Sequence, residues 1–382
     1  MQQHRIPAVA LRSCALAMAI ALAACGQTAE APATPATDAP AEAPTAGTEA
    51  ARDLPVVEEA FVTALTPDDN IDSPAAWTAP DGATWVIATA KATDRLVIYE
   101  GATGETLRTF GTLGTGEGQF DRPNGVAVVD DLLFVVERDT PRVQLLSLPD
   151  LRPQASFGGD ELRAPYGIWL RESAPRELEA FVTDSFMYGE RHDVVPPAEE
   201  LAQRVRRYRL RFDDQGHLDA TYAGSFGETD GPARLNMVES IAGDPVHDRL
   251  LVAEEDRTSP SNLHVYDFDG GWSGRSLPEG TFAGEAEGVV LWACGARSGY
   301  WLAVDQQAPL TWFHLFDRET LAPAGSFHGA VTANTDGIAL HAAATPRFPG
   351  GVLYAVHDDR AVSAFDLRDI ARQLDLDPAC AD

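Results

Sequence analysis

The sequence contains little cysteine and little positive charge. Of its 382 residues four are cysteine, and its nine histidines show no spacing typical of zinc ligands, so no zinc site is expected. Lysine and arginine number 29 against 58 acidic residues, which gives a formal net charge of −29. Nucleic acids and anionic membrane surfaces would repel such a chain, so the expected partners are cations.

Residues 1–25 are typical of an export signal. A basic start precedes an apolar run from Ala8 to Ala24, which is interrupted by Arg12 and is too short for a stable membrane span. Leu22-Ala23-Ala24-Cys25 resembles a bacterial lipobox, in which Cys25 becomes the lipidated first residue, and Gly26 favours outer-membrane sorting. We expect a protein anchored by lipid at Cys25 to the periplasmic side of the outer membrane or the cell surface. Ordinary secretion is the alternative.

Composition divides the rest of the chain into a tether and one domain. Residues 26–52 are rich in Ala, Pro and Thr and have almost no large apolar side chains, so they are expected to stay disordered. Residues 54–377 are long enough for one large core. Signal removal and lipidation leave Cys294 and Cys380, which in an oxidising compartment are equally compatible with a disulfide and with two buried thiols.

A repeat of about 50 residues dominates this domain. Six segments each begin with a polar residue, continue with Gly or Ser and end in apolar residues; they start at Asp72, Asn124, Tyr166, Glu239, Glu287 and Asp336. Further apolar runs of strand length follow each one. Four strands per unit are typical of a propeller blade. The repeat therefore predicts an all-β fold, a six-bladed β-propeller with four-stranded antiparallel blades around a central channel, and we expect a monomer.

One interval of the repeat is longer than the others. Tyr166 and Glu239 are 73 positions apart, and this interval contains the segment 186–203, with Pro196-Pro197 and a helix-like run over 198–202. The segment is either a loop inserted into blade three, lying over one face, or a disordered excursion.

The repeat also predicts an acidic channel mouth. First strands of propeller blades line the channel, so the six starting residues should converge, and four of them are carboxylates. A second set should lie beside them, at the ends of the next strands: Lys91, Arg138, Asp184, Glu254-Glu255-Asp256, Asp305-Gln306 and His357-Asp358. Clustered carboxylates repel one another unless a cation intervenes, and oxygen ligands in loose geometry suit Ca²⁺. Alternatively, these residues only end strands and begin turns.

The ordered motifs resemble those of the β-propeller phytases, which are secreted calcium-dependent enzymes. The resemblance is clearest in Leu235–Glu239, Leu250–Asp256, Glu285–Gly288, Gly299–Gln306 and Asn334–Ile338. It implies hydrolysis of phosphate from myo-inositol hexakisphosphate or a related ester by metal-activated water. The metal positions that it implies are Asp72, Glu239, Glu254, Glu255, Glu285, Glu287, Gln306 and Asp336. It also implies substrate contacts from Lys91, Arg138 and Tyr166, and catalytic roles for Glu254, Glu287, Lys91 and Arg138.

The chain departs from the phytase pattern at several positions. Ser73 replaces the second aspartate of a paired motif, His357 stands where the family has Gln, and a blade-three lysine is missing near Asp184. The stretch 110–138 resembles an NHL repeat instead. Two other functions therefore stay open: a non-catalytic NHL-like propeller that binds a ligand or protein at the outer membrane, and another hydrolase, such as a lactonase, that uses the same channel.

Overall fold

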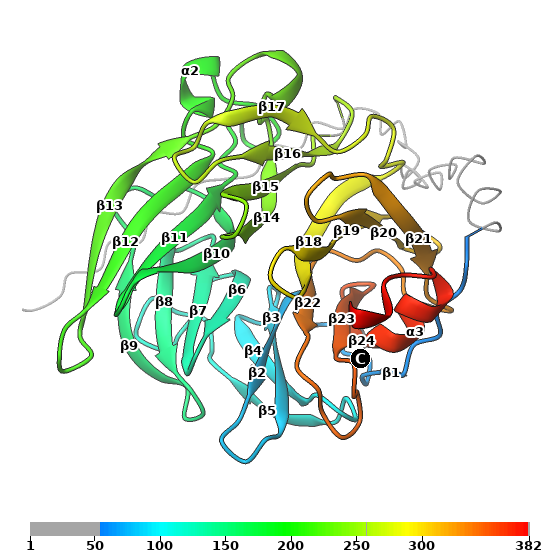
Figure 1. The fold of residues 1–382 in the computed structure, drawn as a ribbon. Helices are drawn as coiled ribbons and strands as arrows, with labels where there is room; N and C mark the ends of the chain where they lie inside the picture. The colour runs from blue at the N-terminus through cyan, green and yellow to red at the C-terminus, as the bar shows by residue number, and fades with distance from the viewer. Residues whose placement is uncertain (1–53, 257, 381–382) are drawn as a thin grey trace, which may run out of the picture. The chain divides into compact units, whose positions relative to one another are not determined.

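Six four-stranded antiparallel sheets form a ring, which confirms the predicted six-bladed β-propeller (Figure 1). The structure, a computed structural model, describes residues 54–256 and 258–380. The expected signal peptide (1–25), its lipidation site Cys25 and the tether (26–52) lie outside these residues. Within the described ranges, no helix has the length and apolar character needed to cross a bilayer.

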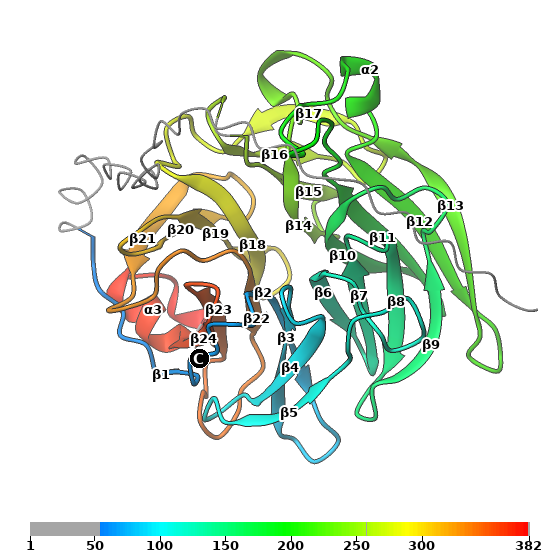
Figure 2. The ribbon, with the colours of Figure 1, turned by 180° about the vertical axis from the view of Figure 1, so that it is seen from behind.

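Each blade runs from an inner strand at the channel to an outer strand at the rim (Figure 2). The first three blades are β2 (Ile71–Thr78), β3 (Thr84–Ala90), β4 (Arg95–Glu100) and β5 (Thr106–Phe110); β6 (Pro123–Val129), β7 (Leu132–Glu137), β8 (Arg142–Ser147) and β9 (Arg152–Phe157); and β10 (Pro165–Ala174), β11 (Glu177–Asp184), β12 (Val205–Phe212) and β13 (Leu218–Phe226). The next two are β14 (Val238–Asp244), β15 (Arg249–Glu254), β16 (Asn262–Tyr266) and β17 (Trp272–Ser276); and β18 (Glu285–Cys294), β19 (Ser298–Gln306), β20 (Trp312–Asp317) and β21 (Pro323–His328).

The sixth blade joins the two ends of the domain. Its inner three strands are β22 (Ile338–His341), β23 (Val352–His357) and β24 (Ala361–Asp366), while its outer strand is β1 (Phe61–Val62). Phe61 pairs with Ala364 and Val62 with Ser363, in antiparallel register. The sequence reading did not predict this closure, in which the N-terminal strand completes the last sheet.

The core consists of apolar clusters between neighbouring blades. Strand side chains alternate between the two faces of each sheet. The apolar side chains on each face of a blade therefore pack against the neighbouring blade. Blades five and six, for example, share Trp292, Leu302, Phe313 and Leu353, all almost completely buried. Similar clusters fill the other blade junctions of the described domain. The ring is thus held by apolar burial at each seam.

Glycine after the starting residue of a repeat lets adjacent inner strands approach closely. A Cβ atom on Gly125 would lie 2.2 Å from the main-chain oxygen of Tyr166, and one on Gly167 would lie 2.2 Å from that of Glu239. A side chain there would push the blades apart. The glycine of the repeat therefore fixes how tightly the starting residues crowd around the channel.

Short helices and a disulfide complete the domain. These helices are α2 (Ala198–Leu201), α3 (Leu367–Gln373) and the 3₁₀ turns Gly231–Ala233 and Pro378–Cys380. Cys294 on β18 is bonded to Cys380, with 4.8 Å between the Cα atoms. Of the two alternatives for this pair, the disulfide is confirmed, and it ties the C-terminal turn to blade five.

Candidate metal and anion site

The structure brings the six starting residues of the repeat together. Asp72, Asn124, Tyr166, Glu239, Glu287 and Asp336 all line one narrow cavity of about 30 Å³, which we call the channel mouth. Each comes from a different blade, because each opens or precedes an inner strand. The convergence expected from the repeat is therefore present, while the role of these residues as ligands stays a prediction.

Three glutamates form a compact group at the channel mouth, the acidic triad Glu239, Glu255 and Glu287. One carboxylate oxygen of each lies within 4.8 Å of the others. Glu255 and Glu287 are buried, at 3% and 6% exposure. Glu255 Oε1 has no hydrogen-bond partner among the described residues, although it is shielded from water. A buried carboxylate oxygen without a donor is costly unless a proton or cation satisfies it.

The triad has an electrostatic reason to accept a cation. Burial raises the pKa of Glu255 and Glu287 well above the usual range of a glutamate, and mutual repulsion within the triad raises both further. Burial also raises the pKa of Glu239 to about 8, although Lys91 opposes this shift. A divalent cation would remove the repulsion and replace lost hydration. The three side chains offer carboxylate oxygens and no nitrogen or sulfur, a donor set that would fit Ca²⁺.

Lysine neutralises the opposite side of the channel mouth. Lys91 Nζ lies 2.6 Å from Asp72 Oδ1 and 3.6 Å from Asp336 Oδ2. Burial lowers the pKa of Lys91, but these two carboxylates outweigh burial and raise it overall. Gln306 donates its side-chain amide to Asp336, and Ser73 Oγ donates to Asp72 Oδ2 at 3.0 Å. Asp72 and Asp336 are therefore already paired within the protein.

Glu285 lies near the triad on the same strand as Glu287. It stands opposite Gln306 in the register of β18 and β19. Its charge contributes to the raised pKa of Glu239, Glu255 and Glu287. The predicted metal position at Glu285 is thus close enough to act on the triad electrostatically.

Glu254 is placed differently from the other predicted ligands. Its carboxylate accepts hydrogen bonds from the main-chain N–H groups of Asn236 at 2.5 Å, Met237 at 3.3 Å and Asp256 at 2.9 Å. Burial raises its pKa to about 7. Glu254 therefore holds the loop before β14, whereas its neighbour Glu255 is part of the acidic triad.

The same loop-holding arrangement recurs in other blades, a role that the sequence reading missed. Asp184 accepts from the N–H groups of Arg163 and Ala164, just before β10. Asp305 accepts from Ala283 and Gly284, just before β18. These carboxylates stand at one register of the repeat, near the ends of second strands, and that register was the available signal. Asp184 and Asp305 are thus loop anchors beside the channel mouth.

A larger cavity of about 760 Å³, the lateral cavity, adjoins the channel mouth and shares Tyr166 and Glu239 with it. Arg138 Nη1 donates to Tyr166 Oη at 3.2 Å on its wall. Burial and the nearby Glu239 raise the pKa of Tyr166. Guanidinium groups bind phosphate and carboxylate oxygens well, so this cavity offers anion-binding groups next to the carboxylates.

The segment 186–203 forms part of the lateral cavity wall. Phe186, Met187, Arg191 and His192 line the cavity. The helix-like run is confirmed as α2, and of the two alternatives for this segment the inserted loop is the one observed. We call residues 186–203 the blade-three insertion.

Comparisons with known proteins assign neither a family nor a function to the chain. No family model matches the chain, and no curated protein sequence is significantly similar to it. Among solved structures, a nidogen/laminin complex is similar at 16% identity over 72% of this chain and 87% of that chain, with a TM-score of 0.46. The hydrazine synthase of Kuenenia stuttgartiensis is similar at 13% identity over 84% of each chain, with a TM-score of 0.45. At these levels of identity, a shared function does not follow from either likeness.

Proposed function

We propose that the protein is a calcium-dependent phosphomonoesterase. The observation that carries the proposal is the acidic triad, whose oxygens lie within 4.8 Å of one another beside an arginine-bearing cavity. Cation-assisted phosphate chemistry requires groups that hold a metal next to groups that bind an anion. The ordered resemblance to β-propeller phytases supports the same activity on inositol hexakisphosphate or a related ester.

Different residues of the chain would bind the metal and the phosphate. Glu239, Glu255 and Glu287 would hold the calcium. A bound calcium ion lowers the pKa of a coordinated water and offsets phosphate charge. Arg138, oriented by its hydrogen bond to Tyr166, binds phosphate oxygens from the lateral cavity. Lys91 reduces the repulsion that Asp72 and Asp336 would exert on an approaching anion.

Two observations favour a second candidate, a propeller that binds a ligand or protein partner without catalysis. Lys91, expected to contact substrate phosphate, is paired with Asp72 and Asp336. Ser73 supplies a hydroxyl where the phytase pattern has a second carboxylate. The channel mouth thus has fewer free charges for metal and phosphate than the family pattern implies.

Phosphate release by the purified protein decides between the two candidates. We expect release from p-nitrophenyl phosphate or calcium phytate with calcium and none with EDTA. Glu287→Gln and Asp336→Asn should reduce release strongly, whereas the matched control Glu172→Gln, on an exposed part of β10, should leave it unchanged. Calcium binding without phosphate release would favour the binding propeller, and absence of calcium binding would refute the metal site.

Export and anchoring also stay proposals, since Cys25 lies outside the described residues. The Cys294–Cys380 disulfide supports an oxidising compartment outside the cytoplasm. Mass spectrometry of the mature N-terminus tests lipidation, which a Cys25→Ser variant should abolish. An unmodified, cleaved N-terminus in the wild-type protein would instead indicate ordinary secretion.

A further inference from the structure

The blade-three insertion is an addition to the propeller plan. In blade three the second and third strands are joined by residues 185–204, whereas residues 91–94 make the same connection in blade one and residues 358–360 in blade six. The extra chain lies at the lateral cavity, next to the channel mouth. Its side chains therefore help to decide which ligands fit beside the acidic triad.

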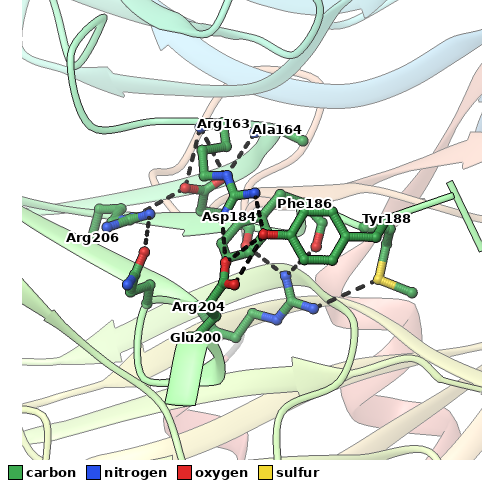
Figure 3. A network of polar contacts seen from close by, with 10 residues as sticks. Arg163, Ala164, Asp184, Phe186, Tyr188, Glu200, Arg204 and Arg206 are labelled. Carbon is green, nitrogen blue, oxygen red and sulfur yellow. Dashed lines mark hydrogen bonds and ion pairs between the residues drawn. The ribbon is translucent and has the colours of Figure 1, made fainter. Parts of the chain in front are cut away.

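Buried and stacked arginines hold the insertion in place (Figure 3). Arg204, fully buried, donates to the main-chain oxygens of Asp184 at 3.0 Å and Phe186 at 2.8 Å. Arg163 forms an ion pair with Glu200 at 2.6 Å, and its guanidinium carbon lies 3.7 Å from the ring centre of Phe186. These hydrogen bonds, the ion pair and the cation–π contact hold the insertion as a fixed part of the cavity wall.

The positive charge of the lateral cavity is largely balanced. Each arginine that lines the cavity forms an ion pair: Arg138 with Asp139 at 2.7 Å, Arg163 with Glu200 at 2.6 Å and Arg191 with Asp193 at 2.7 Å. Glu239 adds another carboxylate to the lining. A ligand with many phosphates would therefore meet little net positive charge beyond that of the metal, whereas a single phosphate needs only one of these guanidinium groups.

Part of the cavity lining is apolar. Met187 of the insertion and Met237 of the loop before β14 both line it, together with Pro141. Met187 and Met237 are partly buried, so each keeps some surface toward the cavity. Methionine side chains adapt to flat or irregular apolar groups, and their burial against such a group is favourable.

We infer that the lateral cavity selects a phosphate monoester with one phosphate on a largely apolar alcohol, aryl or alkyl, over a polyphosphorylated polyol. The inference rests on the proposed function for the reaction and deepens it by naming the substrate class. The phosphate lies at Arg138 and the acidic triad, and the apolar body packs on Met187 and Met237. A polyol that carries several phosphates would place charge and hydroxyl groups against these methionines without partners.

Binding of non-hydrolysable ligands tests the inference apart from catalysis. The purified protein, with excess calcium, is titrated calorimetrically with phenylphosphonate, methylphosphonate and inositol hexakissulfate. Phenylphosphonate should bind about tenfold more tightly than methylphosphonate, because both carry the same anionic group and only the first has an apolar body. It should also bind more tightly than the polyanion.

Substitution of one cavity methionine locates the selectivity. Met187→Ala should weaken phenylphosphonate binding by about tenfold and leave methylphosphonate binding unchanged. The matched control, Val194→Ala, changes another apolar residue of the same insertion that is 51% exposed, and it should alter neither affinity. Unchanged methylphosphonate binding also shows that the variant is folded.

The possible results separate this inference from the proposed function. Equal affinity for the two phosphonates, preference for the polyanion, or an equal loss of both phosphonates in Met187→Ala would overturn the inference, even if the protein hydrolyses phosphate esters. Selective phosphonate binding without hydrolysis of any ester would support the ligand class and overturn the proposed catalysis.

Discussion

Two consecutive glutamates at the end of β15 show how strand geometry separates roles at the residue scale. Successive side chains of an extended chain point in opposite directions. Glu254 accepts hydrogen bonds from the main-chain N–H groups of Asn236 and Met237 in the loop before β14, while Glu255 belongs to the acidic triad. The same acidic residue type thus stabilises a loop at one position and is available to a metal at the next.

Substitution of each glutamate by glutamine should separate these roles. Glu255→Gln should weaken calcium binding by about one to two orders of magnitude, because one charged ligand is lost. Glu254→Gln should instead lower the free energy of unfolding by about 1–3 kcal/mol, because the amide nitrogen is no acceptor for the loop N–H groups, and should leave calcium affinity nearly unchanged. Calorimetric calcium titration and urea unfolding measure the two effects. Equal effects of both substitutions on calcium affinity would contradict this assignment.

The raised pKa values predict how stability depends on pH. Burial raises the pKa of Glu239 from 4.5 to about 8, so the folded protein binds more protons than the unfolded chain between these values. The free energy of unfolding in EDTA should therefore fall as the pH rises from about 5 to 8. Excess calcium should flatten or reverse this slope, because the metal binds the deprotonated carboxylates. Urea unfolding at several pH values measures the slope, and a rise with pH in EDTA would argue against a buried, metal-free triad.

Much of the candidate site followed from the repeat, but the direction of individual side chains did not. The register of the starting residues indicated that Asp72 and Glu287 would meet at the channel, although they lie far apart in the sequence. The split between Glu254 and Glu255 depends on where β15 ends, and composition does not specify that residue. The ion pair of Lys91 with Asp336 likewise depends on side-chain reach between blades one and six.

At the element scale, the shortest strand closes the ring. β1 contains two residues, too few for a recognisable apolar pattern, and its partner β24 lies at the other end of the domain. Contacts around β1 reinforce the junction. Thr63 N donates to Val362 O at 2.9 Å, and Glu59 accepts from the N–H groups of Ala330 and Thr332. The sequence therefore predicted six blades without indicating which segment completes the last one.

Removal of this segment should weaken the ring. A chain that begins at Thr66 loses β1 and the Glu59 contacts, which exposes the edge of β24. Its midpoint of thermal unfolding should fall by many degrees compared with a chain that begins at Leu54, and it should aggregate more readily. Calorimetry and light scattering compare the two chains. Equal midpoints would show that β1 is dispensable for closure.

The blade-three insertion illustrates a different limit of prediction. The long interval in the repeat located it, and its helix-like run matched α2. Its course was not predictable, because it depends on the ion pair of Glu200 with Arg163, outside the insertion, and on the bonds of Arg204 back to its start. Where a segment joins the fold by such contacts, its local sequence specifies little of its position.

At the scale of the whole molecule, the acidic triad spans a blade junction. Glu239 and Glu255 belong to blade four and Glu287 to blade five. A cation held by all three would cross-link these two blades, and the ring depends on each junction between neighbouring blades. Calcium should therefore stabilise the entire propeller and not only its mouth.

Calcium should raise the unfolding midpoint of the whole domain in one transition. At a free concentration one hundred times Kd, the expected gain is about 2.7 kcal/mol, by mass action. Differential scanning calorimetry in EDTA and in calcium measures the shift, and Glu287→Gln should reduce it. A shift of equal size in that variant would place the stabilising ion elsewhere.

Pairing of β1 with β24 has a consequence for the order of events during biosynthesis. Thr63 and Val362 are 299 positions apart, so the first strand emerges from the ribosome long before its partner exists. Until the final blade has formed, the polypeptide keeps an unpaired strand edge that can pair with the wrong strands. A contact between residues so far apart in the sequence also forms slowly. We therefore expect the folding chain to benefit from chaperone protection during that interval.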